Sequence, residues 1–79
     1  MTADWRERIT VDDRVLVGKP TIRGLRISVE HVLRALANGV PEAELMADYP
    51  DLEPDDIRAC LNYAAESVAG ERVYRVAVA

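Results

Sequence analysis

The reactive side chains of this chain are too few and too scattered to form an obvious catalytic centre. Its 79 residues include one histidine, His31, and one cysteine, Cys60, whereas a zinc site needs three or four ligands at suitable spacing. His31 is expected at the surface or rim of a helix, and Cys60 as a buried thiol in an alanine-rich helix. Gly18-Lys19-Pro20 lacks the glycine-rich run and the Ser/Thr of a phosphate loop. We therefore expect no enzymatic activity, no catalytic residue, no cofactor and no metal.

Two pairs of carboxylates, Asp12-Asp13 and Asp55-Asp56, could in principle serve acid–base chemistry. Their positions favour structural roles. The first pair follows a β-branched run and indicates a turn, and the second follows Pro54 and indicates the start of a helix.

Short strands are predicted over about residues 9–27. The runs 9–12, 15–17 and 21–27 are rich in β-branched or alternating apolar residues, and turn signals separate them. We expect three β-segments that cap a helical core.

Three helices are predicted to follow, at about residues 28–38, 41–49 and 54–69. Ser28 is a good N-cap, Gly39 can close the first helix, and Pro41 and Pro54 suit the first positions of the next two. In the last helix, Ile57, Leu61, Ala64 and Val68 form a narrow apolar seam. The expected fold is α+β and mostly α, with N-terminal strands before a three-helix helix-turn-helix of homeodomain-like or winged-helix-like type. We predict one domain over residues 1–79, with residues 70–79 as a tail.

Composition excludes several classes of protein. A 49% hydrophobic content is too high for disorder, and no apolar run approaches the length of a membrane span. The polar start is not that of a signal peptide, and a single cysteine suits a reducing cytoplasm, which is the expected location. Because so short a chain buries little core, we expect a homodimer.

The net charge of −4 is unevenly distributed. Residues 1–34 hold seven basic and five acidic side chains, a net +2, whereas residues 35–79 hold three basic and nine acidic ones, a net −6. If the protein binds DNA, Lys19, Arg23 and Arg26 are the candidates for phosphate contacts. Arg58 and Asn62 are candidates for base edges, since they lie four residues apart on one helix. The alternatives are a solvated strand face for the first group and an ion pair with a nearby acid for Arg58.

Four ordered sequence blocks carry a resemblance to a known family. They are Gly18-Lys19-Pro20-Thr21-Ile22-Arg23-Gly24-Leu25-Arg26-Ile27-Ser28-Val29, Leu36-Ala37-Asn38-Gly39, Asp48-Tyr49-Pro50-Asp51-Leu52, and Asp56-Ile57 with Leu61-Asn62-Tyr63-Ala64. From Ile9 to Ala65 the chain resembles the small prokaryotic family catalogued as domain of unknown function 433. The family pattern has Thr at Leu25, Pro at Ser28, and Thr or Ser near Glu53. Serine also caps a helix, but glutamate is a weaker cap.

The resemblance implies an antitoxin-like protein of a type II toxin–antitoxin pair, with a three-helix fold of DNA-binding type. The implied partner is a PIN-type ribonuclease, and operator DNA is a possible second partner. Val73, Tyr74 and Val76 in the tail are the candidates for toxin contact, and the acidic half could face a basic RNA groove. The alternative is a stand-alone helix-turn-helix DNA-binding regulator with no toxin partner.

Overall fold

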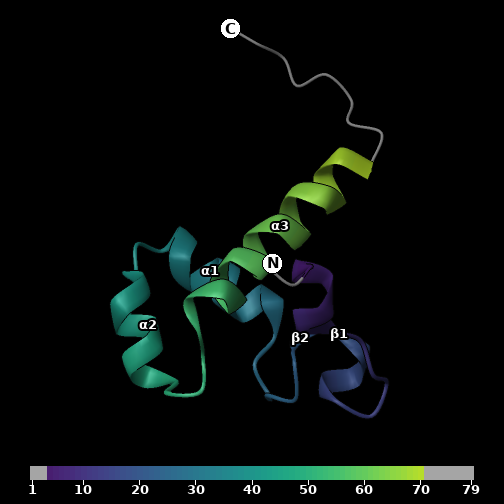
Figure 1. Ribbon diagram of the computed structural model, residues 1–79, viewed down its shortest axis with the longest axis horizontal. Helices are drawn as coiled ribbons and strands as arrows, with labels where there is room; N and C mark the ends of the chain where they lie inside the picture. Colours follow the sequence, from purple (N-terminus) through teal and green to yellow (C-terminus); the bar gives the residue numbers. More distant parts are fainter. Residues whose placement is uncertain (1–3, 71–79) are drawn as a thin grey trace, which may run out of the picture.

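The computed structural model describes residues 4–70 and is mostly helical, with a small antiparallel sheet near the N-terminus (Figure 1). In chain order the elements are the 3₁₀ helix η1 (Trp5–Arg8), strand β1 (Ile9–Thr10), the 3₁₀ helix η2 (Leu16–Gly18), strand β2 (Thr21–Ile22), and the helices α1 (Val29–Ala37), α2 (Glu42–Asp48) and α3 (Pro54–Gly70). The predicted α+β, mostly α class is confirmed. In the part of the chain that the structure describes, no helix is both long and apolar enough to cross a membrane.

The sheet is smaller than the sequence predicted. Ile9 pairs with Ile22 and Thr10 with Thr21, and the two threonine hydroxyls lie 3.0 Å apart. Thr21 also forms an isolated bridge with Ser28. Strand pairing therefore covers only the first two residues of the predicted first and third β-segments.

The predicted strand at residues 15–17 is wrong. Leu16 and Val17 have positive φ angles of 49° and 56°, and the chain turns there through backbone hydrogen bonds from Gly18 N–H to the Val15 carbonyl and from Lys19 N–H to the Leu16 carbonyl. Val17 is 93% exposed. The β-branched composition was misleading because a compact turn between the two short strands overrides the local propensity.

Local capping residues explain where the helices begin and end. The Ser28 hydroxyl accepts a 2.9 Å hydrogen bond from the His31 N–H at the start of α1. Gly39 follows α1 with a φ of +88°, a left-handed conformation that glycine adopts without steric cost. Pro41 precedes α2 and Pro54 opens α3. All three helices lie within a residue or two of the ranges that the sequence predicted.

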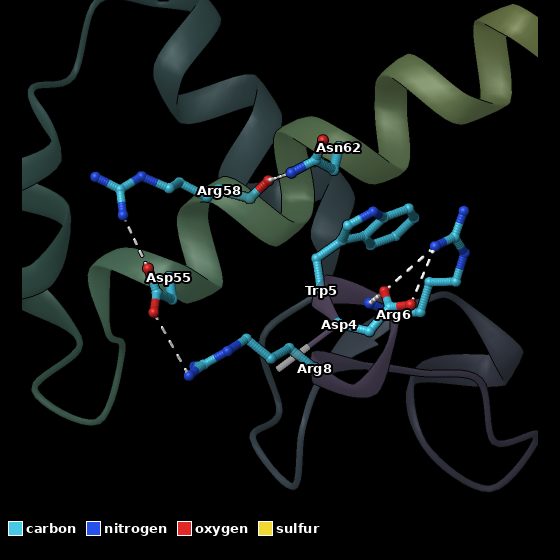
Figure 2. Close-up of a pocket in the computed structure, with 7 residues that line it drawn as sticks. All are labelled: Asp4, Trp5, Arg6, Arg8, Asp55, Arg58 and Asn62. Atoms are coloured by element: carbon cyan, nitrogen blue, oxygen red, sulfur yellow. Dashed lines mark hydrogen bonds and ion pairs between the residues drawn. The ribbon is translucent and has the colours of Figure 1, made fainter. Parts of the chain in front are cut away.

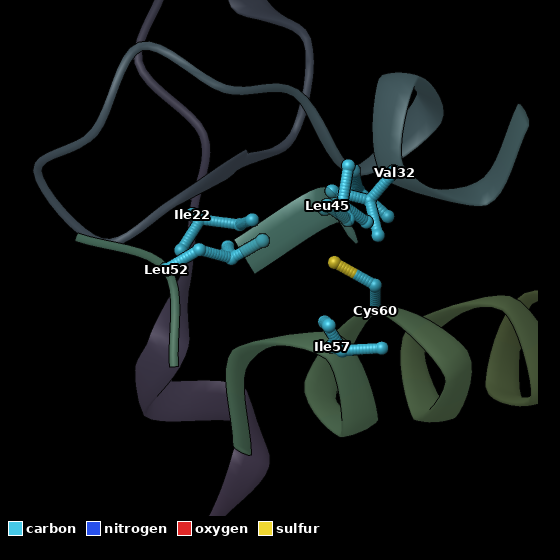
Figure 3. Close-up of a cluster of buried hydrophobic side chains, with 7 residues drawn as sticks. Ile22, Val32, Leu45, Leu52, Ile57 and Cys60 are labelled. Carbon is cyan, nitrogen blue, oxygen red and sulfur yellow. The ribbon is translucent and has the colours of Figure 1, made fainter. Parts of the chain in front are cut away.

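The hydrophobic core lies between β2 and the three helices (Figure 3). Its buried side chains come from every one of these elements and from the loop before α3: Ile22, Val29, Val32, Leu45, Leu52, Ile57 and Cys60. Cys60 is fully buried, as predicted, and burial raises the pKa of its thiol to about 12, with the Asp56 charge adding to the effect. The thiol therefore belongs to the packing of the core.

The predicted apolar seam of α3 is only partly buried. Ile57 is inaccessible to solvent, but Leu61 is 46% and Val68 61% exposed. Cys60 and Asp56 occupy the buried face instead. Figure 1 shows that the C-terminal end of α3 extends beyond the other helices.

Candidate functional site

A buried carboxylate at the start of α3 binds groups from three segments of the chain. The Asp56 side chain has no solvent exposure and accepts hydrogen bonds from Arg8 Nη1 at 2.8 Å and from Arg23 Nε and Nη2 at 3.1 and 2.8 Å. It also accepts the Glu53 backbone N–H at 2.8 Å. The N-terminal turn, the β2 loop and α3 are thus held together at one carboxyl group.

This arrangement fixes the protonation state of the cluster. Burial alone would raise the pKa of Asp56, but the Glu53 N–H and the guanidinium groups of Arg8 and Arg23 outweigh it, and the pKa is lowered. Hydrogen bonds to Glu53 and Asp56 raise the pKa of Arg8. The ion pairs are therefore fully charged near neutral pH.

The sequence interpretation of Asp56 as a helix-start residue was correct but missed its partners. Asp56 lies three residues after the N-cap position Glu53, and its contact with the Glu53 N–H is one half of a capping box. That spacing is visible in the sequence. The contacts with Arg8 and Arg23 bridge 48 and 33 residues, so no local pattern indicates them.

Two of the three basic candidates for phosphate contacts bind acidic or carbonyl groups of the protein itself. Lys19 Nζ binds Glu30 Oε1 on α1 at 3.0 Å, and Arg23 is engaged by Asp56 and the Asp51 carbonyl. Arg26 is exposed. The predicted basic patch is therefore largely neutralised by ion pairs, and Arg26 is its remaining free cation among residues 4–70.

The two α3 candidates lie together on the surface. Arg58 Nη1 binds Asp55 Oδ1 at 2.9 Å, the ion pair that the sequence offered as the alternative, and Asn62 Nδ2 binds the Arg58 carbonyl at 3.0 Å. Both residues are exposed. They line a hollow of about 580 Å³ whose other walls come mainly from the N-terminal turn (Figure 2): Asp4, Trp5, Arg6, Arg8 and Asp55.

The N-terminal turn η1 changes what α3 can present to a ligand. Arg6 reaches Glu66 at 3.4 Å and Arg8 reaches Asp55 at 3.9 Å, so η1 lies along the outer side of α3. The Arg6 guanidinium lies 4.7 Å from the centre of the Trp5 ring. Sequence reasoning did not single out Trp5. Any nucleic acid or protein that contacts Arg58 and Asn62 meets η1 as well.

The surface around α2 carries four carboxylates. Glu42, Glu44, Asp48 and Asp51 are all exposed, and within residues 4–70 none of them forms an ion pair. No Lys or Arg occurs between Arg34 and Arg58 in the sequence. We call these four residues the acidic α2 surface.

An apolar hollow of about 510 Å³ lies between α1 and α3. Five of the residues that line it are apolar or aromatic, and two are charged: Pro20, Val29, Leu33, Ala37, Tyr63, Glu30 and Arg34. The candidate toxin-contact residues Val73, Tyr74 and Val76 lie outside the described residues. Residues 4–70 contain no group of three or more side chains that could hold a metal ion.

Comparison with known proteins gives a family without a described activity. The model of the family described as "Protein of unknown function (DUF433)" matches residues 9–64. The fold is similar to the crystal structure of a DUF433 member protein from Anabaena variabilis ATCC 29413, with a TM-score of 0.74 and 31% sequence identity. That alignment covers 78% of this chain and 61% of the other. A search of curated proteins found no match. The match over residues 9–64 and the shared fold show that the chain belongs to the DUF433 family.

Proposed function

We propose that this protein is an antitoxin-like regulatory protein of the cytoplasm that binds and neutralises a PIN-type ribonuclease. The observation that carries the proposal is the acidic α2 surface, whose four carboxylates have no ion-pair partner among residues 4–70. Elsewhere the described carboxylates of Asp4, Asp12, Glu30, Glu53, Asp55, Asp56 and Glu66 are engaged by basic side chains.

An uncompensated acidic surface suits a basic protein partner. A nuclease must carry a basic groove to hold RNA phosphates, and complementary charge speeds association and selects the partner. Charge repulsion makes the same surface unfavourable for nucleic acid.

The direct test is to look for a PIN-type ribonuclease gene beside the gene of this protein and to measure the binding of the two proteins. We expect the pair to co-purify and the ribonuclease to lose activity. The double variant Glu42→Gln, Glu44→Gln should weaken the complex about tenfold at low salt, because it removes two charges that attract the partner. Isothermal calorimetry or surface plasmon resonance measures this change.

The matched control removes the same charge elsewhere. Glu7 and Asp13 are also exposed and have no ion pair among residues 4–70, so Glu7→Gln, Asp13→Asn has the same net charge as the test variant. It should bind the ribonuclease like the native protein. Equal weakening by both double variants would contradict a role for the α2 surface, and no complex with the ribonuclease would contradict the proposed function.

A stand-alone DNA-binding regulator is the second candidate. It is favoured by Arg58 and Asn62, exposed side chains of the types that read guanine and adenine edges, which lie one turn apart on α3. In this case Arg58→Ala should reduce the preference for upstream DNA over unrelated DNA in a filter-binding titration at about 50 mM salt. Binding no better than background at that salt concentration would exclude this candidate.

A further inference from the structure

Arg26 differs from the other basic side chains of the described chain. Residues 4–70 contain eight Lys and Arg residues, and seven of them form ion pairs with carboxylates. Arg26 is exposed and forms none within these residues. Residues 4–70 therefore contain one cation whose charge is not compensated by a direct contact.

Two hollows meet at Arg26, and they differ in charge. On the side of α1 a hollow of about 230 Å³ is lined by Leu16, Arg26, Ile27, Ser28, His31 and Tyr49, with no carboxylate. On the side of α2 a second hollow includes Asp48 and Asp51. Because Arg26 lines both hollows but only the second contains carboxylates, an anion is expected to favour the first hollow.

The first hollow also contains hydrogen-bonding groups fixed in place. The Tyr49 hydroxyl lies 3.0 Å from His31 Nε2, and the two rings meet edge to face with centroids 5.7 Å apart. When Nε2 carries the proton, it donates to the Tyr49 oxygen and leaves the Tyr49 O–H free to donate to a ligand. The Ser28 oxygen accepts the His31 N–H, so its own O–H is also available as a donor.

We propose that Arg26, His31, Tyr49 and Ser28 form a binding site for a phosphate-type oxyanion. The guanidinium supplies the charge and a forked pair of donors that matches two phosphate oxygens. The two hydroxyl groups supply neutral donors from a second direction. This site does not depend on the ribonuclease partner. No carboxylate lines the hollow, and phosphate binding there uses none of the α2 carboxylates.

His31 is the only histidine of the chain, so its imidazole proton signals report on this site alone. Inorganic phosphate is added to the full chain at constant pH and ionic strength, and the signals are followed by NMR. We expect a saturable shift at millimolar phosphate. Arg26→Ala should weaken the apparent affinity at least about fivefold, because the charge-assisted contact is lost, and Tyr49→Phe should weaken it about threefold by removing one donor.

The control variant is Arg34→Ala. Arg34 is also an exposed arginine close to this region, on α1, but it is paired with Glu30 at 2.9 Å and does not line the hollow. It should leave the phosphate affinity unchanged. A shift that does not saturate, or equal affinity in the Arg26→Ala and native proteins, would overturn the site, as would equal loss in the Arg34→Ala protein.

The source of the phosphate is distinguished by competition. A duplex oligonucleotide that produces the same His31 shift and displaces inorganic phosphate identifies the nucleic-acid backbone as the ligand, and a duplex without effect identifies a free oxyanion. Both outcomes retain the site. The double variant Glu42→Gln, Glu44→Gln should bind phosphate normally, so a failure of the ribonuclease proposal is separable from a failure of this one.

Discussion

At the scale of single residues, Asp56 determines how the N-terminal turn is attached to the helical body. Its carboxylate is buried and bound by Arg8, Arg23 and the Glu53 N–H. Asp56→Asn keeps the size of the side chain but removes the buried charge that binds two guanidinium groups, which are partly exposed and keep Glu53 as an acidic partner. Loss of a hydrogen bond to a charged group costs about 1.5–3 kcal/mol. We expect a decrease of that size in the free energy of unfolding, measured by urea denaturation.

The control for this variant is the neighbouring residue. Asp55 pairs with Arg58, but its side chain is 47% exposed, and exposed pairs contribute about 0–1 kcal/mol. Asp55→Asn should therefore change the unfolding free energy by no more than about 0.5 kcal/mol. Equal decreases in the unfolding free energy for the two substitutions would contradict the role of Asp56 in attaching the N-terminal turn.

The lowered pKa of Asp56 also predicts how stability depends on pH. In the unfolded chain an aspartate titrates near pH 3.9, and in the folded protein Asp56 titrates below its usual range. Its stabilising contribution is therefore fully present above about pH 4 and is lost as the pH falls through the folded value. Unfolding midpoints measured between pH 7 and pH 2.5 should decrease less steeply for Asp56→Asn than for the native protein. Parallel curves would show that another carboxylate controls acid unfolding.

At the scale of elements, the sequence predicted the helices closely and the β-region only in part, for physical reasons. Helix ends depend on near neighbours such as Ser28, Gly39 and Pro54, so a short window of sequence contains the signal. The turn at Val17 lies in the segment that connects the paired strands β1 and β2. No local sequence pattern indicates that pairing. Similarly, the pairing of Arg23 with Asp56 removed one candidate phosphate contact that sequence spacing alone had left free.

The turn η2 provides a prediction at this scale. Val17 has a φ of +56° and is 93% exposed, so a β-branched residue is strained there without packing to offset the strain. Asparagine tolerates this conformation better. Val17→Asn should therefore raise the free energy of unfolding by about 1 kcal/mol. The control Val11→Asn replaces a valine that is 63% exposed and has no positive φ, and it should be neutral or slightly destabilising.

At the scale of the whole molecule, ion pairs redistribute the charge that the sequence divides into two halves. Arg8 and Arg23 from the basic half bind Asp56 at the start of α3, and Arg6 reaches Glu66 on the same helix. Much of the basic half is thereby used in ion pairs, and four of the carboxylates without an ion pair among residues 4–70 lie on or next to α2. The sequence predicted the imbalance between the halves, but only the tertiary contacts show where the uncompensated charge lies.

The whole molecule also has apolar surface without a covering element among residues 4–70. Leu61, near the middle of α3, and Val68, near its C-terminal end, are exposed two turns apart, and their spacing places them on the same side of the helix. If the predicted homodimer forms through this side of α3, light scattering should give about twice the 8.8 kDa of one chain. The double variant Leu61→Glu, Val68→Glu should then be monomeric, because it places charge in an apolar contact, while Val11→Glu should remain dimeric. A native mass of 8.8 kDa would contradict the dimer, and a dimeric double variant would assign the contact to another surface, such as the apolar hollow between α1 and α3.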